Sequence, residues 1–250
     1  MRNGLIHCIT NPISMNQCAN AVLALGGRPI MAEHSLEVEE ITATSAALLL
    51  NLGNISERRM EAMLRAFRVA NECQIPVVID AVGIACSELR RIFVQGLVES
   101  NQAAVIKGNY SEMLALADPT YKSSGVDAGT VPDLTEMKAV VSGLATKHQA
   151  VIVATGAVDL VATPGYEADK VTEIRGGSPM LSQVTGTGCM LGAVIATALA
   201  AFGTSTGETV EKACQVFKDC GRRAADSAGD GHGGTFMVKL LDELGEYDGF

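Results

Sequence analysis

The apolar positions of the chain form short continuous runs that alternate with longer segments of mixed polarity. A short apolar run bounded by turn residues is typical of a strand that is covered on both faces of a parallel sheet. We expect six such strands, in residues 4–10, 28–32, 46–52, 75–82, 103–108 and 149–156, and a further strand pair joined by a loop in residues 159–165 and 170–177.

Segments with helical spacing or helix-favouring composition follow most of these runs. Ser56 has the position of an N-cap for a helix over 57–73, and Ser14 to Gln17 look like a capping box for a helix that stops at Gly26-Gly27. We expect the other helices in residues 35–45, where a serine opens the segment, in 87–100, from 109 onward, and in 134–148, 189–202, 207–228 and 235–245.

The repeated strand–helix units predict an α/β fold with a mostly parallel central sheet and helices on both faces. No linker, repeat or change in composition divides the chain, so we expect a single domain over residues 1–250. Residues 118–133 lack periodicity and indicate a surface loop. Ligands of such folds bind at the carboxyl ends of the strands, so the residues just after each strand are the candidates for function.

The composition excludes several kinds of ligand and indicates the cellular compartment. The net charge of −9 and an aromatic content of 4% without tryptophan argue against a nucleic-acid groove. The seven cysteines have irregular spacing without C-x-x-C, which indicates neither a zinc site nor a redox pair. No apolar run approaches a membrane span, and the N-terminus lacks a long apolar leader region. We therefore expect a cytoplasmic protein with free thiols and no membrane partner.

The glycine-rich turn Thr185-Gly186-Thr187-Gly188-Cys189 stands directly before a long apolar segment. Free amides at a helix N-terminus bind anions, and glycine lets a phosphate approach closely. A turn that only packs the helix on the sheet explains the sequence equally well. The turn lacks the Gly-Lys-Ser/Thr of a P-loop, and the spacing of Gly186, Gly188 and Gly192 differs from the dinucleotide-binding fingerprint.

Cys189 has two interpretations. Most free cysteines are small buried hydrophobic residues, and without further context this one favours that role. A thiol in the first turn of a helix also lies near the positive end of the dipole, which favours the thiolate. Such a thiolate, beside a transferable phosphoryl group, is able to deprotonate an alcohol.

Other polar residues follow the predicted strands. Asp80 ends a buried apolar run, where a carboxylate is costly unless it is paired, solvated or near a cation. Asn109 to Glu112 make a good helix N-cap, and the same N-x-x-E spacing suits a carboxylate that reaches magnesium through water beside nucleotide phosphates. Lys107 and Thr155 also stand at strand ends.

The order of the segments "HCITN", "DAVG", "IKGNYSE", "VIVATG", "VTGTGC" and "GGTF" closely resembles the hydroxyethylthiazole kinase family of the ribokinase-like superfamily. The resemblance extends from about residue 5 to the last predicted helix. It implies a ribokinase-like fold without a lid domain, and transfer of a phosphoryl group from ATP to the primary alcohol of 4-methyl-5-(2-hydroxyethyl)thiazole in thiamine biosynthesis. It also implies a homotrimer with thiazole sites at the subunit boundaries.

By this resemblance, Asn11 and Met31 contact the thiazole, and Gly186 lies beside its hydroxyethyl arm. The amides around Gly186 and Gly188 meet the transferred phosphoryl group. Cys189 occupies the position at which many superfamily members have an aspartate base.

For the nucleotide and its metal, the resemblance implies that Lys107, Thr155 and Asn109 contribute to ATP binding. Asp80 and Glu112 support Mg²⁺ and its waters. The chain departs from the family pattern at Ala81, where proline is usual, and at Lys107, where arginine is frequent. A kinase for another small alcohol, of the hydroxymethylpyrimidine or pyridoxal type, and a non-catalytic nucleotide- or thiazole-binding paralogue are the alternatives.

Overall fold

The computed structural model describes residues 4–121, 133–202, 207–229 and 231–247. Its strands form one eight-stranded sheet in the order β2-β1-β3-β4-β5-β6-β7-β8. The strands from β2 to β6 run parallel, whereas β7 pairs antiparallel with both β6 and β8. The strands are β1 (Leu5–Ile9), β2 (Arg28–Ile30), β3 (Ala47–Asn51), β4 (Val77–Asp80), β5 (Val105–Asn109), β6 (Val151–Thr155), β7 (Asp159–Ala162) and β8 (Thr172–Ile174).

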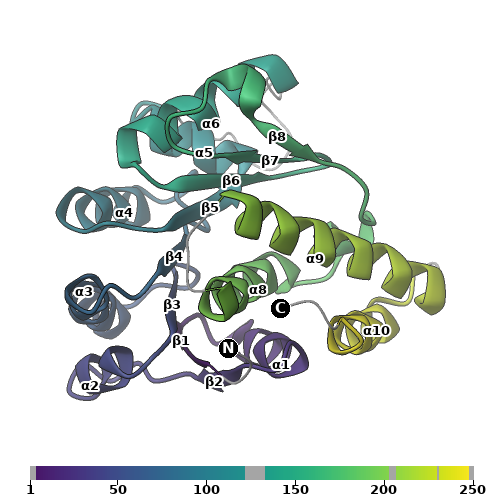
Figure 1. Ribbon diagram of the computed structural model, residues 1–250, viewed down its shortest axis with the longest axis horizontal. Coiled ribbons are helices and arrows are strands. Elements are labelled where there is room, and N and C mark those ends of the chain that lie inside the picture. Colours follow the sequence, from purple (N-terminus) through teal and green to yellow (C-terminus); the bar gives the residue numbers. More distant parts are fainter. Residues whose placement is uncertain (1–3, 122–132, 203–206, 230, 248–250) are drawn as a thin grey trace.

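Helices cover both faces of this sheet (Figure 1). One face carries α2 (Val38–Ala43), α3 (Glu57–Glu72), α4 (Glu88–Ser100), α5 (Tyr110–Ala117) and α6 (Leu134–His148). The other face carries α1 (Met15–Ala24), α8 (Thr187–Phe202), α9 (Gly207–Ala228) and α10 (Gly233–Gly245). The short helix α7 (Met180–Gln183) and a 3₁₀ turn (Ala168–Lys170) lie in the connections before α8.

Strand β3 shows how the apolar run divides between the two cores. Leu48 and Leu50 pack among α2–α6, and Leu49 packs on the opposite face. All three leucines are fully buried because helices cover both faces. The continuous apolar pattern, without alternation, is the expected sequence of such a strand.

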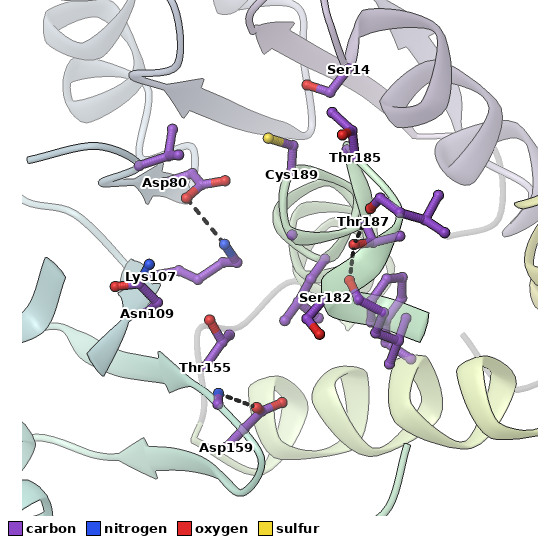
Figure 2. Close-up of a pocket in the computed structure, with 18 of the residues that line it drawn as sticks. Ser14, Asp80, Lys107, Asn109, Thr155, Asp159, Ser182, Thr185, Thr187 and Cys189 are labelled. Atoms are coloured by element: carbon purple, nitrogen blue, oxygen red, sulfur yellow. Dashed lines mark hydrogen bonds and ion pairs between the residues drawn. The ribbon is translucent and has the colours of Figure 1, made fainter. Parts of the chain in front are cut away.

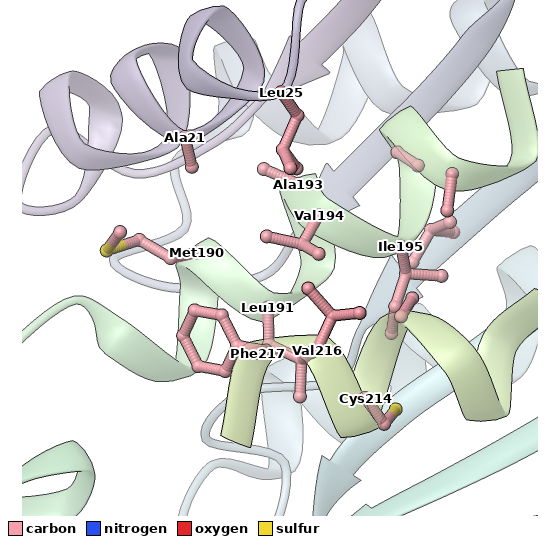
Figure 3. Packing of buried hydrophobic residues seen from close by; sticks show 14 of the residues in the cluster. Ala21, Leu25, Met190, Leu191, Ala193, Val194, Ile195, Cys214, Val216 and Phe217 are labelled. Atoms are coloured by element: carbon pink, nitrogen blue, oxygen red, sulfur yellow. The ribbon is translucent and has the colours of Figure 1, made fainter. Parts of the chain in front are cut away.

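Helix α8 is buried along most of its length between α1 and α9 (Figure 3). Met190, Leu191 and Val194 point into this packed layer beside Phe217 of α9. The prediction of a buried helix is confirmed in this segment. Among the described residues, no helix has both the length and the apolar character that a membrane crossing requires.

One predicted capping box and one predicted helix start are wrong. Ser14 precedes α1, but its backbone is not in the extended region of an N-cap and its side chain makes no capping hydrogen bond. Helix α2 begins at Val38 and not directly after Ser35. Ser35 lies in a turn that precedes the helix, in which the amides of Glu37 and Val38 both donate to the carbonyl of His34.

The remaining predicted strands and helices agree with the structure to within a few residues. Helix α10 begins at Gly233, two residues before the expected start. The N-caps at Ser56 and Asn109 are confirmed by hydrogen bonds to the amides of Arg59 and Glu112. Most of the predicted loop over 118–133 lies outside the described residues.

Candidate active site

A cavity of about 1140 Å³ opens at the carboxyl ends of the parallel strands, beside the N-terminus of α8 (Figure 2). Its walls come from segments far apart in the sequence that the sheet order brings together. Nine of the ten predicted site residues line it: Asn11, Asp80, Lys107, Asn109, Glu112, Thr155, Gly186, Gly188 and Cys189.

Met31 is the predicted site residue that does not line this cavity. It directly follows the edge strand β2 and is half-buried against the core on the α1–α8 face. Within one chain, Met31 therefore does not line the cavity together with the other nine residues.

The glycine-rich turn is the entry to α8. Gly186 has a φ of +97°, and its carbonyl accepts the first helical hydrogen bond, from the amide of Met190 at 2.9 Å. The hydroxyl of Thr187 donates to the carbonyls of Leu181 and Val184, which ties the turn to α7. The first amides of a helix have no partner within the helix, so this turn has the properties of an anion site on the cavity wall.

Gly186 and Gly188 provide a matched pair of alanine substitutions. Gly186→Ala is expected to lower the free energy of unfolding by about 1–3 kcal/mol, because alanine avoids this positive φ. Gly188→Ala is expected to leave stability unchanged or raise it slightly, because the added Cβ meets no atom within 4 Å apart from its chain neighbours and the backbone of its own helix. Urea unfolding of both variants measures the difference, and equal stabilities would contradict the role given to the Gly186 backbone.

A buried ion pair lies opposite this turn. Lys107 Nζ donates to Asp80 Oδ1 at 3.1 Å, and both side chains are almost completely buried. Burial raises the pKa of Asp80, and Lys107 opposes that rise. Burial lowers the pKa of Lys107, but Asp80, Cys189 and Glu112 together raise it by more, so its pKa is raised and it remains a cation. The site therefore keeps a fixed positive charge beside a carboxylate.

Glu112 is the second buried carboxylate of the cavity. Its Oε1 accepts from the Gly83 amide and its Oε2 from the Asn109 amide, each at 2.7 Å. Asn109 and Glu112 thus form a capping box at the start of α5, which is the structural role that their spacing predicts. Burial and the nearby Asp80 raise the pKa of Glu112, and the two amides oppose that rise.

Cys189 lies in the first turn of α8, with its sulfur toward the cavity (Figure 2). The amide nitrogen Asn11 Nδ2 donates to Cys189 Sγ at 3.6 Å. Cys189 is only partly buried, unlike Cys18 nearby, whose pKa burial and the Cys189 charge raise to about 12. Among these two thiols, only Cys189 lines the cavity.

A second buried ion pair at the opposite end of the cavity was not expected from the sequence. Lys218 on α9 lies 3.2 Å from Asp159 and also donates to the carbonyls of Gly156 and Ala157. Asp159 in turn accepts from the Gly156 amide at 2.9 Å. These contacts hold the loop that follows Thr155, so Lys218 and Asp159 shape this wall.

Asn51 is a further residue of the site that the sequence did not lead us to expect. It is the last residue of β3 and bonds to both Asn11 and Asp80. Its position at the end of a buried apolar run is the same signal that singles out Asp80. Lys218 offers a weaker signal, since it lies four residues after Cys214 on the apolar face of α9.

Comparisons with known proteins decide the family. The chain matches the model of the "Hydroxyethylthiazole kinase family" over residues 1–248. It is 39% identical to "Hydroxyethylthiazole kinase 2" of Clostridium botulinum (strain Kyoto / Type A2), over 96% of this chain and 89% of that protein. The chain belongs to the hydroxyethylthiazole kinase family. It is thus a phosphotransferase, as the resemblance of its motifs predicts.

Other relatives agree with this membership. The "Hydroxyethylthiazole kinase" of Alkaliphilus metalliredigens (strain QYMF) is 38% identical over 96% of this chain and 86% of that protein. The structure of a hydroxyethylthiazole kinase protein from Pyrococcus horikoshii OT3 has a TM-score of 0.85 at 30% identity, covering 99% of this chain and 90% of that one.

The fold is the ribokinase-like one that the family resemblance implies. A ribokinase-like superfamily protein from Enterococcus faecalis V583 has a TM-score of 0.66 at 14% identity, over 96% of this chain and 86% of that one. At that identity the likeness concerns the fold alone. All eight strands of the described residues belong to one sheet, as expected for a hydroxyethylthiazole kinase without a lid domain.

Proposed function

We propose that the protein transfers the γ-phosphoryl group of ATP to the primary hydroxyl of 4-methyl-5-(2-hydroxyethyl)thiazole, a step of thiamine biosynthesis. The observation that carries this proposal is one cavity in which the Cys189 thiol and the amides of α8 lie opposite the buried Lys107–Asp80 pair. A base, an anion site and a fixed cation are groups that accelerate phosphoryl transfer to an alcohol.

For the nucleotide, we assign the phosphates to the α8 N-terminus and to Lys107. The ammonium of Lys107 is a point charge, so it attracts phosphate without the two-pronged geometry of arginine. Thr155 and Asn109 lie at neighbouring strand ends, where Thr155 pairs with Asn109 in the sheet register. Both line the cavity and are assigned to ATP binding.

The chemistry of the donor set fits Mg²⁺ carried by the nucleotide. Among the described residues, no cluster of three or more histidine, cysteine or acidic side chains could hold a metal ion. Mg²⁺ needs no such cluster, because it keeps several waters and binds through one or two carboxylates plus substrate phosphates. Asp80 and Glu112 retain lone pairs beyond their present hydrogen bonds and would hold it through water. When bound, it neutralises charge on the phosphates.

For the acceptor, we assign the thiazole to the side of the cavity that carries Asn11 and Gly186. Met31 lies apart from this cavity in one chain, and we infer that it completes the thiazole site of a neighbouring subunit in a homotrimer. Ile13, Leu23 and Leu36, which are all largely exposed, provide apolar area for this contact. Light scattering of the purified protein tests the trimer directly.

The reaction proposed for these residues is an in-line transfer. The substrate hydroxyl gives its proton to the Cys189 thiolate while its oxygen bonds to the γ-phosphorus, and the bond between that phosphorus and the ADP oxygen breaks. The amides of residues 186–189 and Lys107 stabilise the charge on the transferred group. Positioning and electrostatics supply most of the acceleration in such reactions.

The experiment that tests the function is an assay of ADP release with MgATP and hydroxyethylthiazole. Turnover with this alcohol, at a higher kcat/KM than with a hydroxymethylpyrimidine or pyridoxal, is the expected result. Preference for another alcohol would replace the proposed substrate. Thiazole binding by calorimetry without ADP release would indicate a non-catalytic paralogue.

We also propose that the enzyme acts in the cytoplasm. All seven cysteines are free thiols, as expected in a reducing compartment. Fractionation of the source cells tests this location.

A further inference from the structure

Asn51 connects two walls of the cavity without lining it. It is completely buried at the end of β3, between β1 and β4. Its Oδ1 accepts from Asn11 Nδ2 and from the Gly53 amide, each at 2.9 Å. Its Nδ2 donates to Asp80 Oδ2 at 2.7 Å. One side-chain amide therefore bonds to a residue on the acceptor side and to a residue on the phosphate side.

Backbone amides determine how both asparagine side chains are oriented. The amide of Gly53 can only donate, so the Asn51 atom facing it is the oxygen, and the nitrogen points at Asp80. Asn11 Oδ1 likewise accepts from the amides of Ile13 and Ser14, each at 3.1 Å. The nitrogen of Asn11 must then face Asn51 Oδ1 and the sulfur of Cys189.

This arrangement gives each hydrogen of Asn11 Nδ2 its own acceptor. One is donated to Asn51 and the other to Cys189 Sγ, 3.6 Å away. We propose that Asn51 is a positioning residue, which holds Asn11 so that its amide donates to the Cys189 sulfur and at the same time holds the Asp80 carboxylate toward Lys107. A hydrogen bond donated to a thiolate stabilises that form of the sulfur.

The hydrogen-bonded chain from Cys189 through Asn11 and Asn51 to Asp80 is called the relay below. Its Asp80 end is equally constrained. Asp80 Oδ2 accepts from Asn51 and its Oδ1 accepts from Lys107, so the two bonds determine the plane of the carboxylate. Asn51 thereby links the proposed base to the proposed phosphate cation through two side chains. The relay is a property of the folded chain, whereas its catalytic consequence depends on the proposed role of Cys189 as base.

Two ionisable groups near Cys189 have to keep their protonation states constant in a test. Cys18 on α1 is a neutral thiol at neutral pH, since its pKa is raised to about 12 by burial and the charge of Cys189. Lys107 on β5 remains a cation because its pKa is raised. Asn51→Leu also removes the hydrogen bond to Asp80, which pairs with Lys107, so Asn11→Ala, which keeps that bond, measures the contribution of Asn11 alone.

The test is the rate at which iodoacetamide alkylates Cys189 in the substrate-free protein, followed peptide by peptide by mass spectrometry. Asn51→Leu is expected to slow this rate about fivefold, the effect of one lost hydrogen bond to the reactive thiolate form. The exposed Cys73 in the same sample is the internal reference, and its rate should not change. An unchanged Cys189 rate in Asn51→Leu would overturn the proposal.

Asn71→Leu is the matched control. Asn71 also bonds through both ends of its amide, to the backbone of Gln102, on the side of the molecule away from the cavity lining. Loss of these bonds in Asn71→Leu should lower stability without slowing the alkylation of Cys189. If Asn51→Leu does not fold, Asn51→Ser breaks the same bridge without adding apolar volume.

A double-mutant cycle distinguishes positioning through Asn11 from a direct effect. Asn11→Ala alone should slow Cys189 alkylation, and adding Asn51→Leu should slow it no further. If the two effects multiply, Asn51 acts on Cys189 by a route other than Asn11, and the proposed positioning of Asn11 is overturned. These rates need no kinase activity, so a failure of the proposed function in the ADP assay leaves the result on Asn51 intact. In an active enzyme, Asn51→Leu should lower kcat more than it changes the KM for the alcohol.

Discussion

Cys189→Ala is expected to lower kcat by about 10²–10⁴-fold, the usual contribution of a general base. Residual turnover should remain, because the amides of the α8 turn and Lys107 still stabilise the transferred phosphoryl group. The KM for the thiazole alcohol should change little, since alanine removes only the sulfur. Steady-state ADP release, with the fold checked by circular dichroism, measures both quantities.

Cys189→Asp is the variant that separates a base from a packing residue. Its carboxylate would be ionised at neutral pH and able to accept the proton, so activity well above that of Cys189→Ala is expected. Cys73→Ala, which changes an exposed thiol outside the cavity, is the control and should retain wild-type kcat. Wild-type kcat in Cys189→Ala, or an inactive but folded Cys189→Asp, would contradict the assignment of the base.

Lys107→Met is expected to have the largest effect on stability, with a loss of about 3–5 kcal/mol in the free energy of unfolding. Removing one partner of a buried ion pair leaves the other charge without compensation. Urea unfolding measures the loss. The double variant Lys107→Met/Asp80→Asn should recover part of it, because the new amide still offers an oxygen to Asn51, but it should not recover activity.

The stability loss in Lys107→Met should depend on pH. Burial raises the pKa of Asp80 in the folded protein, and losing Lys107 raises it further. A raised pKa penalises the ionised form of Asp80, so the folded variant is most stable in acid, where Asp80 is protonated. It loses stability as the pH rises through the pKa of Asp80 in the folded state. The deficit should therefore be larger at about pH 8 than at about pH 5.

Lys239→Met is the surface control for this charge removal. Its partner Asp242 is 3.3 Å away, but both side chains are about half exposed. Such pairs contribute little, so the stability change should stay below about 1 kcal/mol at either pH. A loss in Lys239→Met as large as that in Lys107→Met would show that burial of the ion pair is not the cause.

Local features of this protein were predictable because they depend on neighbours within a few residues. The Asn109–Glu112 capping box needs only the N-x-x-E spacing, and both of its hydrogen bonds form. The apolar run of β3 is itself a local pattern, and a run without alternation is typical of a strand covered on both faces. Ser14 shows the limit of such local rules, because its hydroxyl lies in the cavity wall near Cys18 rather than on the helix amides.

The sequence by itself determined the alternation of strands and helices, the turn at Gly186 and the family, since each depends on local spacing or motif order. Only the tertiary structure decided that Asn51 bridges Asn11 and Asp80, that Lys218 pairs with Asp159, and that Met31 does not line the cavity. The reason is physical. Which strand ends are adjacent follows from the order of strands in the sheet, and that order is set by burial between distant segments. A buried polar side chain must then bond to whatever partner this order brings within reach.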